Sequence, residues 1–342
     1  MKQFLFWPAM AAVFALSACN PDDNNNPSPA VSYASGVYVT AEGSFPNGAG
    51  ALTYQSRDRS VYVRDLFQQA NSRPLGNTTQ SMAHWNNTGI LVVNNANKLE
   101  FVNLSDFKST GELAGFELPS RIAVLGNKAY VTEWVSFGGN GRVKVVDLAS
   151  KTIVKTLNAG AFPDAITVHN GKVYVANSNG NSILVINPTT DSYDDTLLVG
   201  DYPNSFASDI AGDLWVLCGG VPSFAGTPTA ASLWKLGQTT AFLDLGVRSS
   251  TNDLCTNKDK TKFYFSMEGA LRELDPTSSA AIPTTVLNRN FYAIGFDPVS
   301  GFFYGTDAVD FSSSGKLIRY NSSFIALDSV ETGVAPGSIY FK

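Results

Sequence analysis

Aromatic side chains with the chemistry to bind a ligand gather in four segments rich in glycine and other small residues. These segments, residues 43–50, 134–141, 219–230 and 308–315, carry Phe45, Trp134, Phe137, Phe224 and Phe311. Aromatic rings on long loops offer flat contacts to a ring-bearing ligand. Each ring can instead pack onto the strands that carry its own loop, and the sequence leaves that alternative open.

Two arginines, Arg121 and Arg289, lie shortly after the entry to two expected strands and are predicted near a central axis. A guanidinium that points into a water-filled channel can hold an anionic or amide-bearing ligand. The alternative is a salt bridge between neighbouring repeat units. Phe162 and Tyr202 each directly precede a proline and are expected to line the same opening.

A polar side chain follows the second expected strand in most repeat units. The members of this polar ring are Glu42, Asn94, Glu133, Asn177, Glu268 and Asp307. Carboxylate and amide oxygens are calcium ligands, so a hard-cation site is one interpretation. The other is loop capping, in which these side chains bond to nearby backbone amides. The ring is expected one strand outward from the innermost strands, which favours capping.

The chain has only two histidines and three cysteines, so a His/Cys zinc site is hard to build. His84 and His169 precede tight turns, away from the long loops, and no Ser/His/Asp arrangement emerges. We therefore expect neither an enzyme nor a cofactor. Cys218 and Cys255 either form a disulfide in an oxidising compartment or are small buried residues.

The 342-residue chain carries a net charge of −5, and only 15% of its residues are charged. Binding to a phosphate backbone requires a basic patch, so nucleic acid is not expected as a partner. Beyond the N-terminus, no apolar run reaches the roughly 18–20 residues that a membrane span needs.

Internal repeats indicate the elements that position these residues. An aromatic residue or leucine recurs within a short apolar strand, at Tyr38, Leu91, Tyr130, Tyr174, Trp215, Tyr264 and Tyr304, with spacings of 53, 39, 44, 41, 49 and 40 residues. Such spacings are typical of propeller blades. Tight turns rich in Gly and Asn follow the first strand of each unit, and no sustained helical period occurs.

The repeats predict an all-β, seven-bladed β-propeller over residues 33–342. Its units begin near Asn77, Phe116, Ala161, Asp201, Val247 and Asn288, and the seventh unit is split between the termini. Residues 337–342 read as a first strand and residues 36–40 as a second strand. Pairing them would close the ring and remove its open edge. A pair of β-sandwiches is the alternative fold.

The segments Val173–Ser178 and Ser182–Asn187 resemble the YVTN, or YncE-like, β-propeller repeat. The resemblance extends over about 300 residues and is sharp only between Phe116 and Gly200. It supports the fold directly. It says less about function, because the repeated residues are mostly packing residues.

The N-terminus resembles a bacterial lipoprotein signal. Lys2 and a short apolar stretch precede Leu16-Ser17-Ala18-Cys19, which is similar to a lipobox, so residues 1–18 are expected to be removed and Cys19 to carry the lipid. Residues 19–32 read as a disordered tether rich in Asn and Pro. The acidic pair Asp22 and Asp23 resembles surface-export signals of Bacteroidota lipoproteins.

With this signal, the chain is similar to Bacteroidota propeller lipoproteins that capture cobalamin or siderophores above TonB-dependent transporters. The resemblance implies an outer-membrane lipoprotein that faces the cell exterior, binds a small nutrient or metal chelate and passes it to a transporter. A periplasmic orientation is the alternative localisation. Two other functions stay open: a lactonase-like or quinoprotein-like enzyme, and a surface-layer or adhesion scaffold.

Cys19→Ser is expected to leave an unprocessed or soluble protein, because serine has no thiol to carry a diacylglyceryl group. Palmitate labelling of the producing bacterium, followed by membrane fractionation, measures this. Label that persists in the variant would place the anchor elsewhere. Protease treatment of intact cells tests surface display, and full protection would place the protein in the periplasm.

Overall fold

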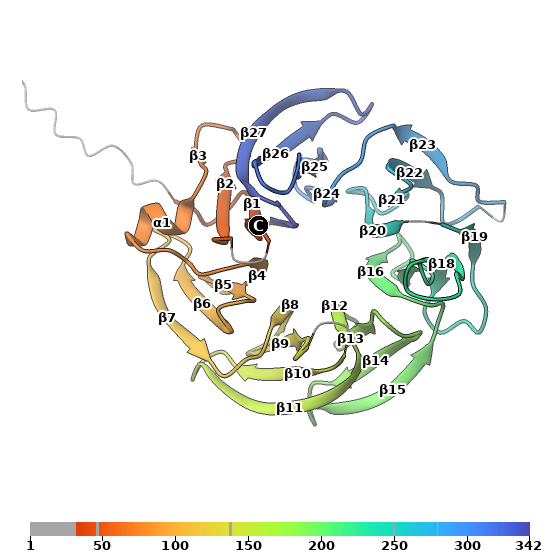
Figure 1. Cartoon of the computed structure of the whole chain (residues 1–342), viewed down its shortest axis with the longest axis horizontal. Helices are drawn as coiled ribbons and strands as arrows, with labels where there is room; N and C mark the ends of the chain where they lie inside the picture. Colours follow the sequence, from red (N-terminus) through yellow and green to blue (C-terminus); the bar gives the residue numbers. More distant parts are fainter. Residues whose placement is uncertain (1–31, 46–47, 137–138, 249, 279) are drawn as a thin grey trace, which may run out of the picture. The chain divides into compact units, whose positions relative to one another are not determined.

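The computed structural model describes residues 32–342 except 46–47, 137–138, 249 and 279. The predicted signal peptide, Cys19 and all of the predicted tether but residue 32 lie outside the described residues. The described chain folds into seven four-stranded antiparallel sheets arranged as blades around an axis (Figure 1). The predicted all-β, seven-bladed propeller is confirmed. Within this described part, no helix is long and apolar enough to cross a membrane.

Four positions recur in each blade, counted outward from the axis. The innermost strands are β4 (Thr79–Trp85), β8 (Pro119–Leu125), β12 (Pro163–His169), β16 (Pro203–Ser208), β20 (Thr251–Thr256), β24 (Ile294–Phe296) and β28 (Ser338–Phe341). The second strands are β1 (Val37–Ala41), β5 (Thr88–Val93), β9 (Lys128–Glu133), β13 (Lys172–Asn177), β17 (Leu214–Cys218), β21 (Phe263–Met267) and β25 (Phe303–Asp307).

The outer half of each blade is built in the same way. The third strands are β2 (Ala51–Gln55), β6 (Lys98–Asn103), β10 (Asn140–Asp147), β14 (Ser182–Asn187), β18 (Ala230–Lys235), β22 (Ala270–Leu274) and β26 (Ser314–Tyr320). The outermost are β3 (Tyr62–Val63), β7 (Ser109–Ala114), β11 (Thr152–Ala161), β15 (Ser192–Leu198), β19 (Leu243–Val247), β23 (Thr284–Leu287) and β27 (Ala326–Val334).

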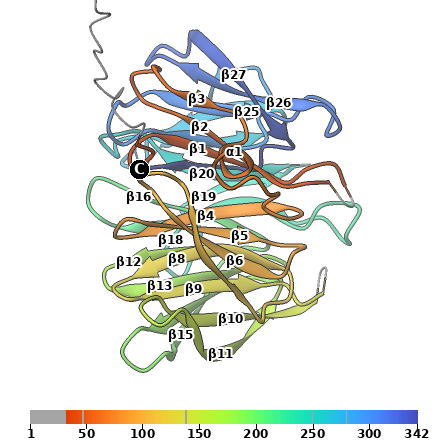
Figure 2. The same ribbon diagram turned by 90° about the vertical axis from the view of Figure 1, so that its left-hand side faces the viewer.

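Tight turns join the first and second strands of the blades. Asn170 and Gly171 have φ angles of 45° and 72°, as a type I′ hairpin requires, and Asn86, Gly126 and Gly212 also have positive φ. We call the face with these hairpins the hairpin face. The face with the connections between second and third strands is the mouth face. In the side view of Figure 2 the C-terminus lies on one face and the β1–β2 connection extends from the other.

The recurring aromatic or leucine occupies the second strand of every blade, as the repeat spacing predicts. Six of the seven are buried, namely Tyr38, Leu91, Tyr130, Trp215, Tyr264 and Tyr304. The polar tip of a buried ring needs a partner, and several of these rings have one. The Tyr130 hydroxyl donates to Asp191 at 2.8 Å, and the Trp215 indole donates to Asp209 at 2.9 Å. The core is thus a series of apolar layers between blades.

The closing blade, β28-β1-β2-β3, joins the two ends of the described chain. Strand β28 pairs antiparallel with β1, with Val37 opposite Phe341 and Thr40 opposite Ser338. The predicted closure by the terminal strands is therefore confirmed. It gives the closing blade its innermost strand, so β1 pairs with a strand on each side.

Arg57, in the β2–β3 turn, fastens the closing blade to its neighbour. Its Nε and Nη2 donate to the two oxygens of Asp297 at 2.8 and 3.0 Å, and its Nη1 donates to the Lys342 carbonyl at 2.5 Å. The Asp297 side chain is fully buried. Burial raises the pKa of Asp297, but hydrogen bonds from Arg57 and Ser300 outweigh it, so this pKa lies below its ordinary value.

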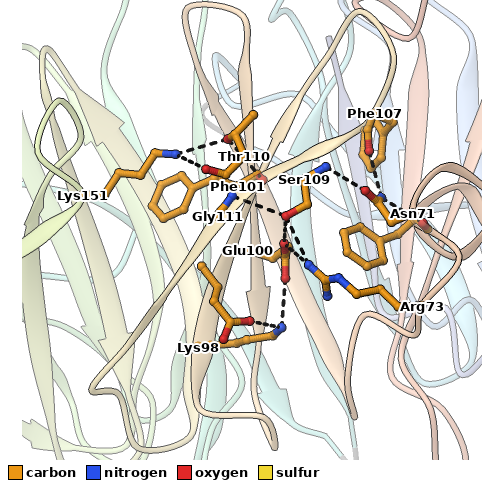
Figure 3. A network of polar contacts seen from close by, with 12 residues as sticks. Asn71, Arg73, Lys98, Glu100, Phe101, Phe107, Ser109, Thr110, Gly111 and Lys151 are labelled. Atoms are coloured by element: carbon orange, nitrogen blue, oxygen red, sulfur yellow. Dashed lines mark hydrogen bonds and ion pairs between the residues drawn. The ribbon is translucent and has the colours of Figure 1, made fainter.

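The single helix of the described chain, α1 (Leu66–Asn71), follows the closing blade and packs beside the next one. Figure 3 shows the polar network at this junction. Glu100 on β6 is fully buried, and its two oxygens accept from Arg73 at 2.7 Å and from Lys98 at 2.9 Å. Ser109 adds a hydrogen bond of 2.5 Å. Two cations compensate the buried carboxylate, as its burial demands.

Arg57→Gln is expected to lower the free energy of unfolding by about 3 kcal/mol, because it leaves the Asp297 carboxylate buried without its partner. The folded pKa of Asp297 is depressed, so its contribution to stability is present above the unfolded pKa and is lost as the pH falls through the folded pKa. Urea unfolding at neutral pH measures the loss. The matched control is Arg64→Gln.

Arg64 belongs to the same blade and pairs with Glu331, but both side chains are half exposed. Removing an exposed pair costs less than about 1 kcal/mol. Equal losses of unfolding free energy in the two variants would contradict the role of Arg57 in fastening the closing blade to its neighbour.

Candidate functional site

A strained turn leads into the innermost strand of four blades. The residue before the strand proline has a positive φ at Leu118, Phe162, Tyr202 and Ala335, with values of 49°, 54°, 58° and 52°. This conformation is unfavourable for bulky side chains and persists only when the surroundings impose it.

Hydrogen bonds from the adjacent second strand impose the conformation. The carbonyls of Phe162 and Tyr202 accept from the amides of Ser178 and Gly219, at 3.0 and 2.9 Å. The strain therefore holds two aromatic residues at the mouth face, where the sequence predicts Phe162 and Tyr202.

A pocket of about 440 Å³ opens on the mouth face, and we call it the axial pocket. Four predicted ligand-binding residues line it: Phe45, Arg121, Trp134 and Phe162. Glu42, Gln80, Asp164 and Tyr292 line it as well. The walls come from blades that are far apart in the sequence, so closure of the ring is what assembles this pocket.

Stacked aromatic rings form one wall of the axial pocket. Trp134 and Phe162 lie with their ring centroids 4.6 Å apart and their planes at 19°. The Trp134 indole donates to Asp164 at 3.2 Å, which fixes the ring's orientation. Phe45 is 96% exposed at the rim. The wall presents a flat apolar surface whose edge is polar.

Charged groups also line the axial pocket. Arg121 Nε lies 3.7 Å from an Asp164 oxygen, and Arg121 Nη1 donates to the Gln80 carbonyl at 3.1 Å. Tyr292 donates to Glu42 at 3.0 Å. Desolvation raises the pKa of Glu42, although the Tyr292 hydrogen bond and the Arg121 charge oppose the shift. The salt-bridge alternative for Arg121 is thus present, and it coexists with a place in the pocket.

Asp253 on β20 is a further acidic group near the axis. Desolvation raises its pKa to about 6, and the charge of Arg121, on β8, opposes that shift. Its carboxylate accepts from Asn252 at 3.2 Å, and its φ is 63°. The position within the repeat places Asp253 near the axis, but the sequence does not show that Arg121 and Asp253 act on each other across the ring.

Four predicted ligand-binding residues, Tyr202, Phe224, Phe311 and Arg289, do not line the axial pocket. Tyr202 lines a neighbouring pocket, to which Phe162 also contributes. Phe311 packs edge-on against Tyr292, with the ring centroids 5.0 Å apart. It therefore contacts a residue that lines the axial pocket. Phe224 is 90% exposed on the β17–β18 connection. Phe137 lies outside the described residues.

Arg289 lies away from the axis, contrary to the expected position. It pairs with Asp307 at 2.6 Å and lines a groove beside Lys316 on β26 and Asp328 on β27. Arg289 lies in the connection between β23 and β24, before the innermost strand begins, and meets the outer strands instead of the channel.

The polar ring makes local contacts on the mouth face. Asn94 donates to the Pro119 carbonyl at 2.8 Å, and Asn177 donates to Ser182 at 2.9 Å. Glu133 accepts from Arg142 at 2.9 Å and from the Glu117 amide at 2.7 Å. Of these contacts, only the bond from the Glu117 amide is of the kind that the capping interpretation describes; the others go to a carbonyl or to side chains.

The Glu42 carboxylate accepts from Tyr292, and the Asp307 carboxylate accepts from Arg289. Glu268 directly follows β21, and its backbone amide donates to the Ser250 carbonyl at 3.1 Å. In the described residues, no three His, Cys, Asp or Glu side chains lie close enough to hold a metal ion.

Both described cysteines are free thiols. Cys218 packs with Val199 and Val216, whereas Cys255 packs against a different cluster that contains Phe291. Of the two alternatives, the Cys218–Cys255 disulfide is not formed; Cys218 is a small buried residue and Cys255 is partly buried. Burial raises the pKa of Cys218 to about 12, which makes the thiol unreactive.

The two histidines lie on the hairpin face, at the far ends of β4 and β12 from the axial pocket. His84 hydrogen-bonds Tyr340 of the closing blade, and His169 lies 3.4 Å from the Ser208 hydroxyl. Their expected separation from the long loops is confirmed.

Asp253→Asn is expected to stabilise the protein at about pH 8 by about 1–2 kcal/mol and to have little effect at about pH 4. The folded pKa of Asp253 is raised to about 6. Its favourable contribution is therefore complete below the unfolded pKa and is lost as the pH rises through about 6. Thermal unfolding at the two pH values measures the difference. Asp259→Asn, at an exposed turn position after β20, is the control. Destabilisation by Asp253→Asn at both pH values would contradict the account.

Comparison with solved structures bears on the fold. The chain is similar to a quinoprotein alcohol dehydrogenase-like protein from Bacteroides thetaiotaomicron, with a TM-score of 0.68, 14% identity, and coverage of 91% of this chain and 79% of that chain. A protein of unknown function from Desulfotomaculum acetoxidans gives a TM-score of 0.66 at 11% identity, covering 90% and 98%. Virginiamycin B lyase from Staphylococcus aureus gives 0.56 at 14% identity, covering 75% and 84%. At such identities the likeness shows the fold alone.

Comparison with sequences bears on the family. No curated protein matches the chain. Residues 35–219, more than half of the chain, match the family described as a domain of unknown function, DUF5074. The chain therefore belongs to the DUF5074 family.

Proposed function

We propose that this chain is a surface lipoprotein that captures a compact, ring-bearing nutrient in the axial pocket, without covalent chemistry. The carrying observation is the stacked pair Trp134 and Phe162 beside Arg121 in a pocket of about 440 Å³. Binding sites of this kind combine apolar walls with a few polar groups that orient the ligand.

The chemistry of the pocket favours a flat ligand with polar groups at its edge. The Trp134 and Phe162 wall contacts the face of a ring, and the Arg121 guanidinium can donate to a carboxylate or an amide of the ligand. Tyr292 and Glu42 supply a hydroxyl and a carboxyl on the far side. Cobalamin, a siderophore or a similar metal chelate has these features. A chelate brings its own metal, so the protein needs no ligand set for one.

The N-terminal sequence supports a place for this capture at the outer membrane. A lipid on Cys19 and the tether of residues 19–32 would hold the propeller at the membrane while leaving it free to meet a ligand. In this proposal the protein faces the cell exterior and passes its ligand to a TonB-dependent transporter. A periplasmic orientation would change the source of the ligand but not the pocket.

Arg121→Ala and Trp134→Ala are each expected to weaken binding by about tenfold or more, because each removes about 1.4 kcal/mol or more of contact. Calorimetry of the lipid-free chain with cyanocobalamin, haemin, and catecholate and hydroxamate ferric siderophores measures the affinity. Calcium serves as a test of the polar ring.

His169→Ala, on the hairpin face, is the control and should leave the affinity unchanged. Loss of binding in the His169 variant with retention in the Arg121 and Trp134 variants would place the site on the wrong face. Binding by none of the chelates would reject the proposed ligand class.

A further inference from the structure

A second pocket of about 380 Å³ lies on the mouth face, beside the axial pocket, and we call it the lateral pocket. It lies at the entries to β12, β16 and β20, and Phe162 separates it from the axial pocket. Tyr202, Asn204, Thr251 and Asn252 line it, together with the backbone of Gly219 and Gly220.

The lateral pocket differs from the axial pocket in charge. The described residues that line it include no acidic or basic side chain; they are aromatic, amide, hydroxyl or small residues. The axial pocket, in contrast, contains Glu42, Arg121 and Asp164. A ligand of the lateral pocket must therefore gain affinity from neutral hydrogen bonds and ring contacts, because none of the described lining residues can form an ion pair with it.

The amides of the lateral pocket are held in place and keep hydrogen-bonding capacity. Asn204 donates to the Thr251 carbonyl at 2.9 Å and accepts from the Ser205 hydroxyl at 2.7 Å. Asn252 donates to Asp253 at 3.2 Å. The Asn204 amide also donates to the Tyr202 carbonyl at 3.5 Å, so only its oxygen keeps a free lone pair for a ligand, whereas the Asn252 amide keeps one N–H donor. These amides can donate and accept, as an alternating set of hydroxyl groups requires.

A buried hydroxyl in this pocket lacks a hydrogen-bond partner. Thr251 is 4% exposed, and its Oγ1 has no partner among the described protein atoms. Leaving such a group unpaired costs stability, and native proteins rarely retain one without a reason. Thr251 lines the lateral pocket, and rotation of its side chain toward the pocket would let a ligand hydroxyl supply the missing bond.

Backbone strain, which also occurs at Leu118 and Ala335 in other blades, holds the aromatic residues of this pocket. Phe162 and Tyr202, the two aromatic residues of the lateral pocket, both have positive φ directly before a proline. Strained residues cluster at binding sites, where the strain keeps a side chain in a productive position. Here it holds two rings against a pocket whose other walls are neutral and polar.

We propose that the lateral pocket binds a neutral saccharide. A sugar ring has an apolar C–H face, which fits an aromatic ring, and hydroxyl groups that both donate and accept hydrogen bonds. The geometry pairs these features with Tyr202 and Phe162 on one side and with Asn204, Asn252 and Thr251 on the other. The proposal is independent of the function assigned to the axial pocket, since the two pockets share only Phe162.

The test is binding of neutral hexoses, N-acetylhexosamines and their short oligosaccharides to the lipid-free chain, followed by saturation-transfer NMR and calorimetry. At least one of these probes should bind, and its uronic acid counterpart should bind more weakly because the pocket offers no cation. Thr251→Val should raise Kd roughly fivefold while leaving thermal stability unchanged or higher, because the lost hydroxyl has no partner in the free protein. A purely structural role for Thr251 would instead lower stability.

Tyr202→Leu should raise Kd about tenfold or more. Leucine is tolerated at this strained position, since Leu118 occupies the equivalent place in another blade. Arg121→Gln is the control and should leave saccharide binding unchanged while weakening ligand binding in the axial pocket. No binding by any neutral saccharide, or an unchanged Kd in both the Thr251 and Tyr202 variants, would overturn the proposal without affecting the axial pocket.

Discussion

Closure of the ring is the constraint on which the rest of the structure depends. Each blade packs mainly against its two neighbours, and the last innermost strand, β28, completes a blade whose other strands begin at residue 37. The Arg57 guanidinium joins the turn after β2, the buried Asp297 and the carbonyl of Lys342. The axial pocket depends on this closure, because its lining residues Glu42, Arg121 and Tyr292 come from distant parts of the chain.

Closure of the ring also stabilises the strained turns on the mouth face. A residue with positive φ before a proline would relax if the loop were free. In the ring, the carbonyls of Leu118, Phe162, Tyr202 and Ala335 are each tied to an amide just past the second strand. The packing of the blades offsets the conformational free energy of these positive φ angles. The aromatic side chains of Phe162 and Tyr202 therefore stay at the two pockets.

Most of the fold could be predicted from the sequence, because blades repeat and their packing is local. The single aromatic or leucine position that recurs in each repeat, from Tyr38 in the first to Tyr304 in the last, is enough to locate all seven second strands. The prolines at the starts of β8, β12 and β16 mark inner-strand entries, where the missing donor does no harm.

Less of the site could be predicted, because it depends on contacts across the ring. Arg121 and Phe162 could be placed by their positions in the repeat. The contacts of Arg121 with Asp164 and of Phe162 with Trp134 could not be assigned, because nothing in the local pattern shows which groups meet across blades. Arg289 illustrates the limit: its repeat position suggests the channel, but the residue precedes β24 and pairs with Asp307 beside the outer strands.

Amide hydrogen exchange of the lipid-free chain, with and without the tightest-binding chelate, tests the central claim most directly. The account predicts slower exchange in residues 42–45, 118–121 and 132–136, which border the axial pocket, and unchanged exchange in the hairpins at 126–128 and 170–172. Protection confined to those hairpins would contradict it.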